Sequence, residues 1–253
     1  MSRGLRWFLI FCAVLLAGGL ALALYLGPNV LFFLFHDERD AEPFVLVSFV
    51  DLTSETSREE YRDAYQRPVL SMVADLGGAA LWEGAVRRVI EGRPDDRWDV
   101  LMLVRYPSRK SFVSLVTSSQ YRGVTGARAQ AVRRSAVLAA TPVEGYSPGE
   151  HGTLALLLHR FVDDQARDVY FDEFFTDVLE SAHAFGGAMV WHATTNPLET
   201  DPHFAWTDLV MIGFPGEPEL AEWAREPMWR SRQALARRLM ERWALLELES
   251  TTP

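Results

Sequence analysis

Short apolar runs and helical apolar stripes alternate along residues 43–250. Phe44 to Val50 is a run of β-forming residues, which predicts a buried strand. An amphipathic helix should follow, because apolar residues then recur every three or four positions: Tyr61, Tyr65, Val69, Met72 and Leu76. Overlapping capping boxes at 56–60 should start this helix, and Gly77-Gly78 should end it with a left-handed cap. Pro68 should kink it, because proline removes a backbone hydrogen bond.

The pattern continues through residue 140 with three more strands and further helices. We predict strands at 79–83, 98–106 and 135–140, with a turn through Gly92, Arg93 and Pro94. Residues 108–117 should form a helix, and 121–134 a helix or nearly so. The resulting order is β-α-β-β-α-β, which is the ferredoxin-like arrangement. Residues 43–142 are therefore predicted to be one α+β unit.

The same pattern recurs in the second half of the chain. Two motifs of the first half have counterparts in the second. One is Leu76-Gly77-Gly78 with Trp82, which matches Phe185-Gly186-Gly187 with Trp191, 109 positions later. The other is Tyr106-Pro107, which matches Phe214-Pro215. A second unit at 153–250 should have strands at 153–161, 188–194, 207–214 and 244–248 and helices at 165–185, 219–224 and 228–242. Asp177 replaces the kinking proline, so the first of these helices should be straighter. Residues 143–152, rich in glycine and proline, are the predicted linker.

These motifs resemble a bacterial domain family of unknown function in the dimeric α+β barrel superfamily. The resemblance rests on Tyr61-x3-Tyr65, Gly77-Gly78, Tyr106-Pro107-Ser108 and Ser118-Ser119-Gln120-Tyr121. It covers 44–142 well and 151–249 more loosely, where Gly216 and Pro227 replace Ser108 and Gln120. The superfamily includes small monooxygenases, isomerases and haem-dependent enzymes, so the resemblance implies a fold more than a reaction.

A ferredoxin-like sheet carries helices on one face only, and the other face is too apolar to meet water. A single unit of this kind must dimerise, whereas two tandem units can cover each other. We therefore predict an intramolecular pseudo-dimeric α+β barrel, in which the two sheets face each other. The protein should then be monomeric.

Trp7 to Leu26 contains no charged residue, and twenty residues at roughly 1.5 Å each would cross a bilayer core. Arg3 and Arg6 precede this run and acidic residues follow it, so the remainder is expected outside the cytoplasm. Residues 1–36 are thus predicted to be a single-pass transmembrane anchor. A cleavable signal peptide ending near 21–23 is the alternative.

Composition narrows the classes of function without selecting one. The formal net charge of −9 argues against a nucleic-acid-binding protein, since phosphate binding requires clustered basic residues. Cys12 is the one cysteine, so no intramolecular disulfide can form. The chain has no Gly-rich phosphate loop, no nucleophile elbow and no CxxC motif.

The candidate ligand-pocket residues are His159, His192, Trp191, Arg105 and Glu83. His159 interrupts an apolar strand, and His192 occupies the position that Glu83 has in the first unit. Alternation along a strand places Trp191 and His192 on opposite faces, so only one of them can face a given cavity. The ordinary interpretation of such a histidine is a hydrogen-bonded strand residue. No metal-ligand spacing such as H-x3-H occurs, so no cofactor is predicted, with haem or a metal ion left open.

Two classes of function remain. The first is a tethered, non-catalytic module that binds a small apolar ligand or a protein partner, and the lack of an acid–base constellation favours it. The second is a cofactor-free oxygenase or isomerase that acts on a small apolar or aromatic compound. Five of the eight tryptophans lie in the second half. These residues could line an apolar pocket, which keeps the second class open. An enclosed cavity in the second half with His159 or His192 pointing into it would support catalysis or ligand binding.

Overall fold

The computed structural model describes residues 42–144, 151–199 and 202–250. The predicted anchor and residues 145–150 of the predicted linker lie outside these residues. No helix within the described ranges has the length and apolar character needed to cross a membrane.

The first half contains four strands with helices after the first and the third. The strands are β1 (Phe44–Leu52), β2 (Ala79–Glu91), β3 (Val100–Tyr106) and β4 (Val132–Glu144). Between β1 and β2 lie α3 (Arg58–Tyr61), the π-helical segment η1 (Arg62–Gln66) and α4 (Arg67–Asp75). The turn η2 (Pro94–Asp96) joins β2 to β3, and α5 (Arg109–Thr117) and α6 (Ser119–Ala131) join β3 to β4.

The second half repeats this order of elements. Its strands are β5 (Thr153–Phe161), β6 (Ala188–Glu199), β7 (Asp208–Phe214) and β8 (Met240–Ser250). Helices α7 (Asp164–Glu173) and α8 (Phe175–Ala184) follow β5, and the turn η3 (Pro202–Phe204) precedes β7. Helices α9 (Glu217–Trp223) and α10 (Pro227–Ala236) and the turn η4 (Arg237–Leu239) lead into β8.

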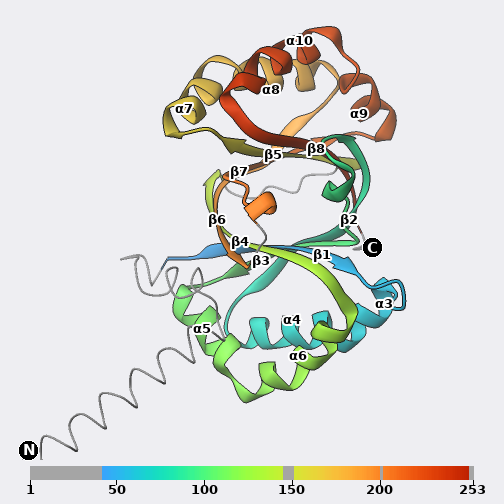
Figure 1. Ribbon diagram of the computed structural model, residues 1–253, viewed down its shortest axis with the longest axis vertical. Helices are drawn as coiled ribbons and strands as arrows, with labels where there is room; N and C mark the ends of the chain where they lie inside the picture. Colours follow the sequence, from blue (N-terminus) through green and yellow to red (C-terminus); the bar gives the residue numbers. More distant parts are fainter. Residues whose placement is uncertain (1–41, 145–150, 200–201, 251–253) are drawn as a thin grey trace, which may run out of the picture.

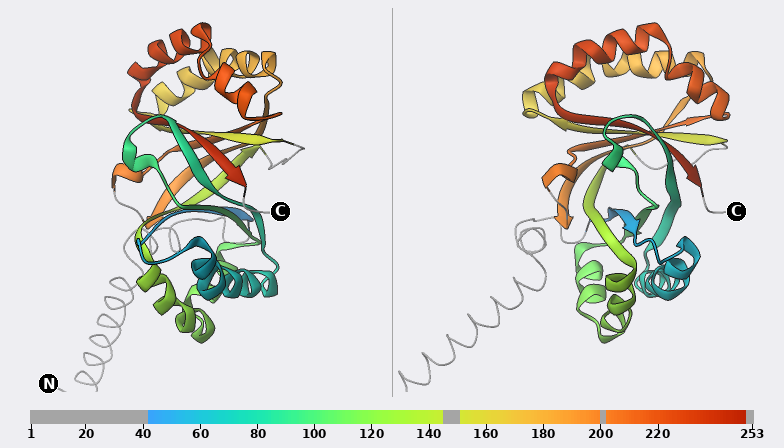
Figure 2. Two further views of the ribbon diagram at one scale, coloured as in Figure 1. Left: turned by 90° about the vertical axis from the view of Figure 1, so that its right-hand side faces the viewer. Right: turned by 45° about the vertical axis from the view of Figure 1, so that its right-hand side comes forward.

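The eight strands close into one antiparallel barrel, in the order β1-β3-β2-β8-β5-β7-β6-β4. The predicted α+β fold with a barrel is therefore confirmed. Helices α3–α6 cover the barrel at one end of the molecule and α7–α10 cover it at the opposite end (Figure 1). The two side views show the same three layers, with the strands between two helical layers (Figure 2).

The barrel closes because β2, β4, β6 and β8 are all longer than the sequence suggests. We predicted that the second strand of each half would end at residues 83 and 194, but β2 reaches Glu91 and β6 reaches Glu199. The extra length of β2 pairs with β8, from Gly84–Ser250 to Glu91–Leu245. The extra length of β6 pairs with β4 of the other half. These pairing partners lie far away in the sequence, so local periodicity could not reveal the strand extensions.

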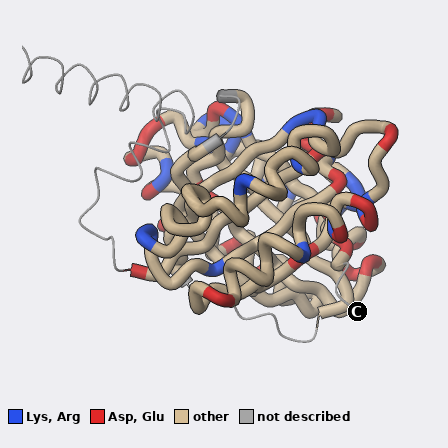
Figure 3. Tube along the Cα trace, turned by 90° about the horizontal axis from the view of Figure 1, so that it is seen from below, with Lys and Arg blue, Asp and Glu red and all other residues tan. Residues whose placement is uncertain are grey.

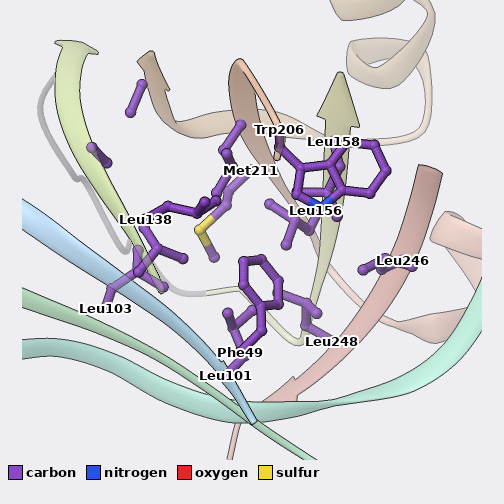
Figure 4. Packing of buried hydrophobic residues seen from close by; sticks show 14 of the residues in the cluster. Phe49, Leu101, Leu103, Leu138, Leu156, Leu158, Trp206, Met211, Leu246 and Leu248 are labelled. Carbon is purple, nitrogen blue, oxygen red and sulfur yellow. The ribbon is translucent and has the colours of Figure 1, made fainter. Parts of the chain in front are cut away.

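The barrel interior is a continuous apolar core to which both halves contribute. Figure 4 shows Phe49, Leu101 and Leu103 of the first half packed against Leu156 and Met211 of the second. All of these side chains are almost fully buried. Two further apolar clusters lie outside the barrel wall, one under α3–α6 and one under α7–α10.

Ion pairs reinforce the junction between β2 and β8. The carboxylate of Glu247 is buried, and Arg88 donates to it with its Nε at 2.9 Å. Arg87 binds Glu217 of α9 at 2.6 Å, so the pairing reaches the helical layer of the second half. Viewed from below, basic and acidic residues are interspersed along the chain (Figure 3).

Most of the signals predicted for the first helix are confirmed, namely its capping box, its glycine cap and its irregularity near Pro68. Ser57 Oγ accepts a hydrogen bond from the Glu60 backbone N–H, and the Glu60 carboxylate accepts one from Ser57 N. At the other end Gly77 has a φ of +80°, which favours glycine. The expected irregularity near Pro68 takes the form of the π-helical segment η1.

The first helix of the second half is not straighter, contrary to the prediction. It breaks at Phe174, where φ is −115° and α7 gives way to α8. Phe174 and Phe175 are both buried, although adjacent residues of a regular α-helix point about 100° apart. The break lets both rings enter the core. Core packing therefore interrupts this helix although it contains no proline.

Candidate functional site

A cavity of about 290 Å³ lies in the first half, between the outer face of the barrel and helices α3–α6. Its floor is formed by strand residues such as Val50, Met102 and Val104. Its roof is formed by η1, α4, α5 and α6, and Leu198 of β6 adds one contact from the second half. Most of the lining is apolar, and the volume is near the lower limit of small-molecule sites.

Two tyrosines from different helices meet at the roof of this cavity. The hydroxyl oxygens of Tyr65 in η1 and Tyr121 in α6 lie 3.2 Å apart and share a hydrogen bond. Burial raises the pKa of Tyr65 well above its ordinary value, with a smaller contribution from the neighbouring Tyr121. The Tyr65 hydroxyl is therefore protonated at neutral pH. Arg128, two turns beyond Tyr121 on α6, also lines the cavity.

Gln66 is the most deeply buried polar side chain of the lining, at 1% exposure. Its Nε2 donates to the Met102 sulfur at 3.8 Å. A thioether is a weak acceptor, so this contact compensates poorly for the burial of an amide. A polar group in this state is suited to bind a polar atom of a ligand.

The π-helical segment places Tyr65 and Gln66 side by side in the cavity wall. Pro68 has no N–H to offer to the preceding turn, and its ring would clash with the carbonyl four residues earlier. The chain responds with a wider turn, in which the Arg67 N–H bonds to the Arg62 carbonyl. Such π-turns recur at functional sites in proteins.

The corresponding space in the second half is filled by larger side chains. Strands β1 and β3 pair from Phe44–Tyr106 to Val50–Val100, and β5 and β7 pair in the same register from Thr153–Phe214 to His159–Asp208. Positions 109 or 108 residues apart are therefore equivalent. At four of these positions the second half has a larger, buried residue. Leu157 replaces Ser48, and Phe175 replaces Gln66. Trp223 replaces Leu115, and Trp229 replaces Tyr121.

His159 and His192 lie in this filled second half. The His159 ring is fully buried against Tyr170, with the ring centroids 4.9 Å apart. His192 packs on Phe171 at 4.6 Å, and its Nε2 lies 3.3 Å from Asp208 Oδ1. Neither histidine lines the cavity of the first half.

Asp208 holds the polar cluster of the second half together. Arg167 Nε donates to both of its carboxylate oxygens, at 3.0 and 3.1 Å. Burial alone would raise the pKa of Asp208, but the hydrogen bonds from His192 and Arg167 outweigh it and lower the pKa. Neither ring nitrogen of His159 has a hydrogen-bond partner among the described residues. Burial lowers the pKa of His159 to about 4, so this ring is neutral at pH 7.

The other three predicted pocket residues lie apart from the histidines and from the cavity lining. Trp191 points into the barrel interior, on the opposite face from His192, as strand alternation predicted. Arg105 is exposed near the end of β3. Glu83 forms an ion pair with Arg62 of η1 at 3.0 Å. No group of three or more potential metal ligands is found among the described residues.

Sequence reasoning missed Tyr65, Gln66, Tyr121 and Arg128 as pocket residues. A signal was available in the comparison of the two halves, because the first has the smaller or more polar residue at several equivalent buried positions. Aromatic abundance pointed to the second half instead. Aromatic side chains line a cavity or fill it equally well, and there they fill it.

Comparison with known proteins identifies the fold. Residues 47–142 match the family described as "Domain of unknown function (DUF1330)". No curated protein matches the sequence.

Solved structures resemble more of the chain. A candidate monooxygenase from Fusobacterium nucleatum subsp. nucleatum shares 9% identity and a TM-score of 0.54, over 83% of this chain and 93% of that one. A candidate monooxygenase from Lactobacillus acidophilus shares 10% identity and a TM-score of 0.50, over 83% and 95%. A protein of unknown function from Rhodopseudomonas palustris is 25% identical over 47% of this chain and 95% of that one, with a TM-score of 0.41. The chain therefore shares its fold with the first two of these structures.

The neutral state of His159 predicts a stability that depends on pH. The unfolded chain should protonate this residue near pH 6.5 and the folded chain only near pH 4, so the unfolded state binds more protons between these values. Stability should therefore fall as the pH drops from 6.5 to 4, by on the order of 3 kcal/mol. His159→Leu should abolish this loss, as measured by urea denaturation at several pH values.

The charged and titratable neighbours of His159 are Asp208, His192 and Tyr170, and Arg167 binds Asp208. Asp208 has a lowered pKa, so its contribution to stability is lost only below the pH range in which His159 acts. His183→Asn, at an exposed position, is the matched control and should leave the pH profile unchanged. An equal loss of stability in His159→Leu and in the wild type would contradict the assignment.

Proposed function

We propose that the protein binds a small, largely apolar, ring-bearing molecule in the cavity of its first half. The observation that carries this proposal is the cavity itself, about 290 Å³ beneath η1 and α6, with a buried glutamine and a tyrosine pair in a mostly apolar wall. Apolar walls with a few placed polar groups are typical of small-molecule sites.

We further propose that the two halves arose by duplication and that only the first kept a binding site. The shared order of elements, the shared strand register and the echoed sequence motifs support this history. The second half would serve to complete the barrel and to cover the apolar sheet face of the first. With both sheet faces covered within one chain, no second copy is needed, and we expect a monomer.

A cofactor-free oxygenase is the second candidate. Two proteins with the same fold are described as candidate monooxygenases, although identities of 9% and 10% carry only the fold. The cavity of the first half would then hold an aromatic substrate, with the hydroxyls of the tyrosine pair as its polar contact. A haem absorbance band in the purified protein would favour haem chemistry instead.

The N-terminal run from Trp7 to Leu26 supports a proposal about location. We propose that it anchors the chain in a membrane, with the two halves outside the cytoplasm. The full chain should stay in the membrane pellet after alkaline carbonate extraction, and a chain without residues 1–36 should be released. Release of the full chain would contradict anchoring.

Leu115→Trp should abolish ligand binding. This change gives the first half the residue that the second half has at the equivalent position, Trp223, and the indole should occupy the cavity. We expect at least a tenfold weaker affinity for mono- and bicyclic aromatic probes such as tetralin and 1-tetralone, which corresponds to about 1.4 kcal/mol. Calorimetric titration of the full chain in phospholipid nanodiscs, with empty nanodiscs as the blank, measures this affinity.

The reciprocal substitution is the matched control. Trp223→Leu removes a large buried side chain from the second half and should destabilise the protein, because a cavity forms there. It should leave the affinity of the first-half site unchanged. If no probe binds the wild type more tightly than Leu115→Trp, the cavity is not a binding site.

Oxygen uptake separates binding from oxygenase activity. For an oxygenase, a probe that binds should raise oxygen consumption above the protein-free rate, and Leu115→Trp should remove that increase. For a binding module, the same probe should bind with no change in oxygen consumption. An oxygen electrode and product analysis by mass spectrometry measure both.

A further inference from the structure

We infer that the ligand carries an oxygen that accepts a hydrogen bond, as in an aryl ketone or a quinone, and that Gln66 determines this specificity. The inference rests on the proposed binding function, since it concerns what that same cavity recognises. It follows from the hydrogen-bonding state of the polar groups in the cavity wall.

Gln66 has a donor that the protein uses poorly. The side chain is 1% exposed and faces the cavity, and its Nε2 contacts the Met102 sulfur at 3.8 Å. Replacing that contact with a bond to a ligand oxygen would exchange a weak acceptor for a strong one. The π-helical segment fixes the position of Gln66 directly beside Tyr65.

The tyrosine pair adds a second donor. Tyr65 and Tyr121 carry one O–H each, and one of the two protons is used in the bond between them. Within the described residues the other O–H has no second hydrogen bond to protein. Burial keeps Tyr65 protonated by raising its pKa, so this pair offers a donor and not a charge.

The wall therefore presents donors that need an acceptor. The guanidinium of Arg128 can only donate, and the sulfur of Met102 accepts weakly. The hydroxyl of Ser48 and the amide of Gln66 each offer a donor and an acceptor. A ligand oxygen that accepts would satisfy the Gln66 Nε2 and the remaining O–H of the tyrosine pair, whereas a ligand with only donors would leave these two donors without a strong acceptor. The second half lacks this selectivity, because Phe175 and Trp229 replace Gln66 and Tyr121.

A matched pair of probes tests the inference on the full chain in nanodiscs. 1-Tetralone and tetralin have nearly the same shape, but only the ketone has an acceptor oxygen. We expect the wild type to bind 1-tetralone roughly five- to tenfold more tightly than tetralin, as expected for one or two net hydrogen bonds. Gln66→Met, which keeps the length of the side chain, should reduce this ratio to about one or two.

Gln233→Met is the control, because Gln233 is also a buried glutamine but belongs to α10 in the filled half. It should leave the ratio unchanged. The double variant Tyr65→Phe with Tyr121→Phe should also lower the ratio, and it keeps the test informative if Gln66→Met does not fold.

The possible failures are distinguishable. If both probes bind the wild type equally and Leu115→Trp abolishes both, the cavity binds ligands but the inferred preference for an acceptor oxygen is wrong. If the wild type and Leu115→Trp have the same affinity for each probe, the proposed binding function is wrong, and this inference is wrong with it. If the wild type prefers 1-tetralone to tetralin and Gln66→Met keeps the same preference, only the role of Gln66 is contradicted.

Discussion

The structure depends on hiding the concave, apolar faces of two four-stranded sheets from water. Each sheet carries helices on its outer face, so its inner face must be covered by something else. The chain solves this by extending β2 and β6 until they pair with β8 and β4, which closes all eight strands into one barrel. Edge strands disappear in a closed barrel, and with them the unpaired backbone groups that invite aggregation.

Closure of the barrel leaves each helical layer to be packed separately. Both halves have the same order of elements and equal strand register, yet the side chains between sheet and helices differ. Phe175, Trp223 and Trp229 fill the second layer, and smaller or polar residues leave about 290 Å³ open in the first. The cavity thus lies in the half with fewer tryptophans among the described residues.

Both halves bury polar groups, but the surroundings of these groups differ. In the second half Asp208 takes hydrogen bonds from Arg167 and His192, whereas both ring nitrogens of His159 and both amide atoms of Gln233 have no partner among the described residues. In the first half the Gln66 amide borders the cavity and contacts the Met102 thioether. A buried polar group enclosed by packed side chains cannot reach a ligand, whereas one beside a cavity is available to it. The position of the cavity is therefore the reason why the function is assigned to the first half.

The sequence by itself determined the α+β class, the order of elements and the barrel, because hydrophobic periodicity, glycine caps and repeated motifs are local signals. It also indicated the irregularity at Pro68 and the opposite faces of Trp191 and His192. Only the tertiary structure decided where strands β2 and β6 end and which half is hollow. Both depend on contacts between residues that are not neighbours in the sequence, such as Gly84 with Ser250 and Val137 with Glu199. A cavity, moreover, is a small difference between large packed volumes, and no local pattern encodes it.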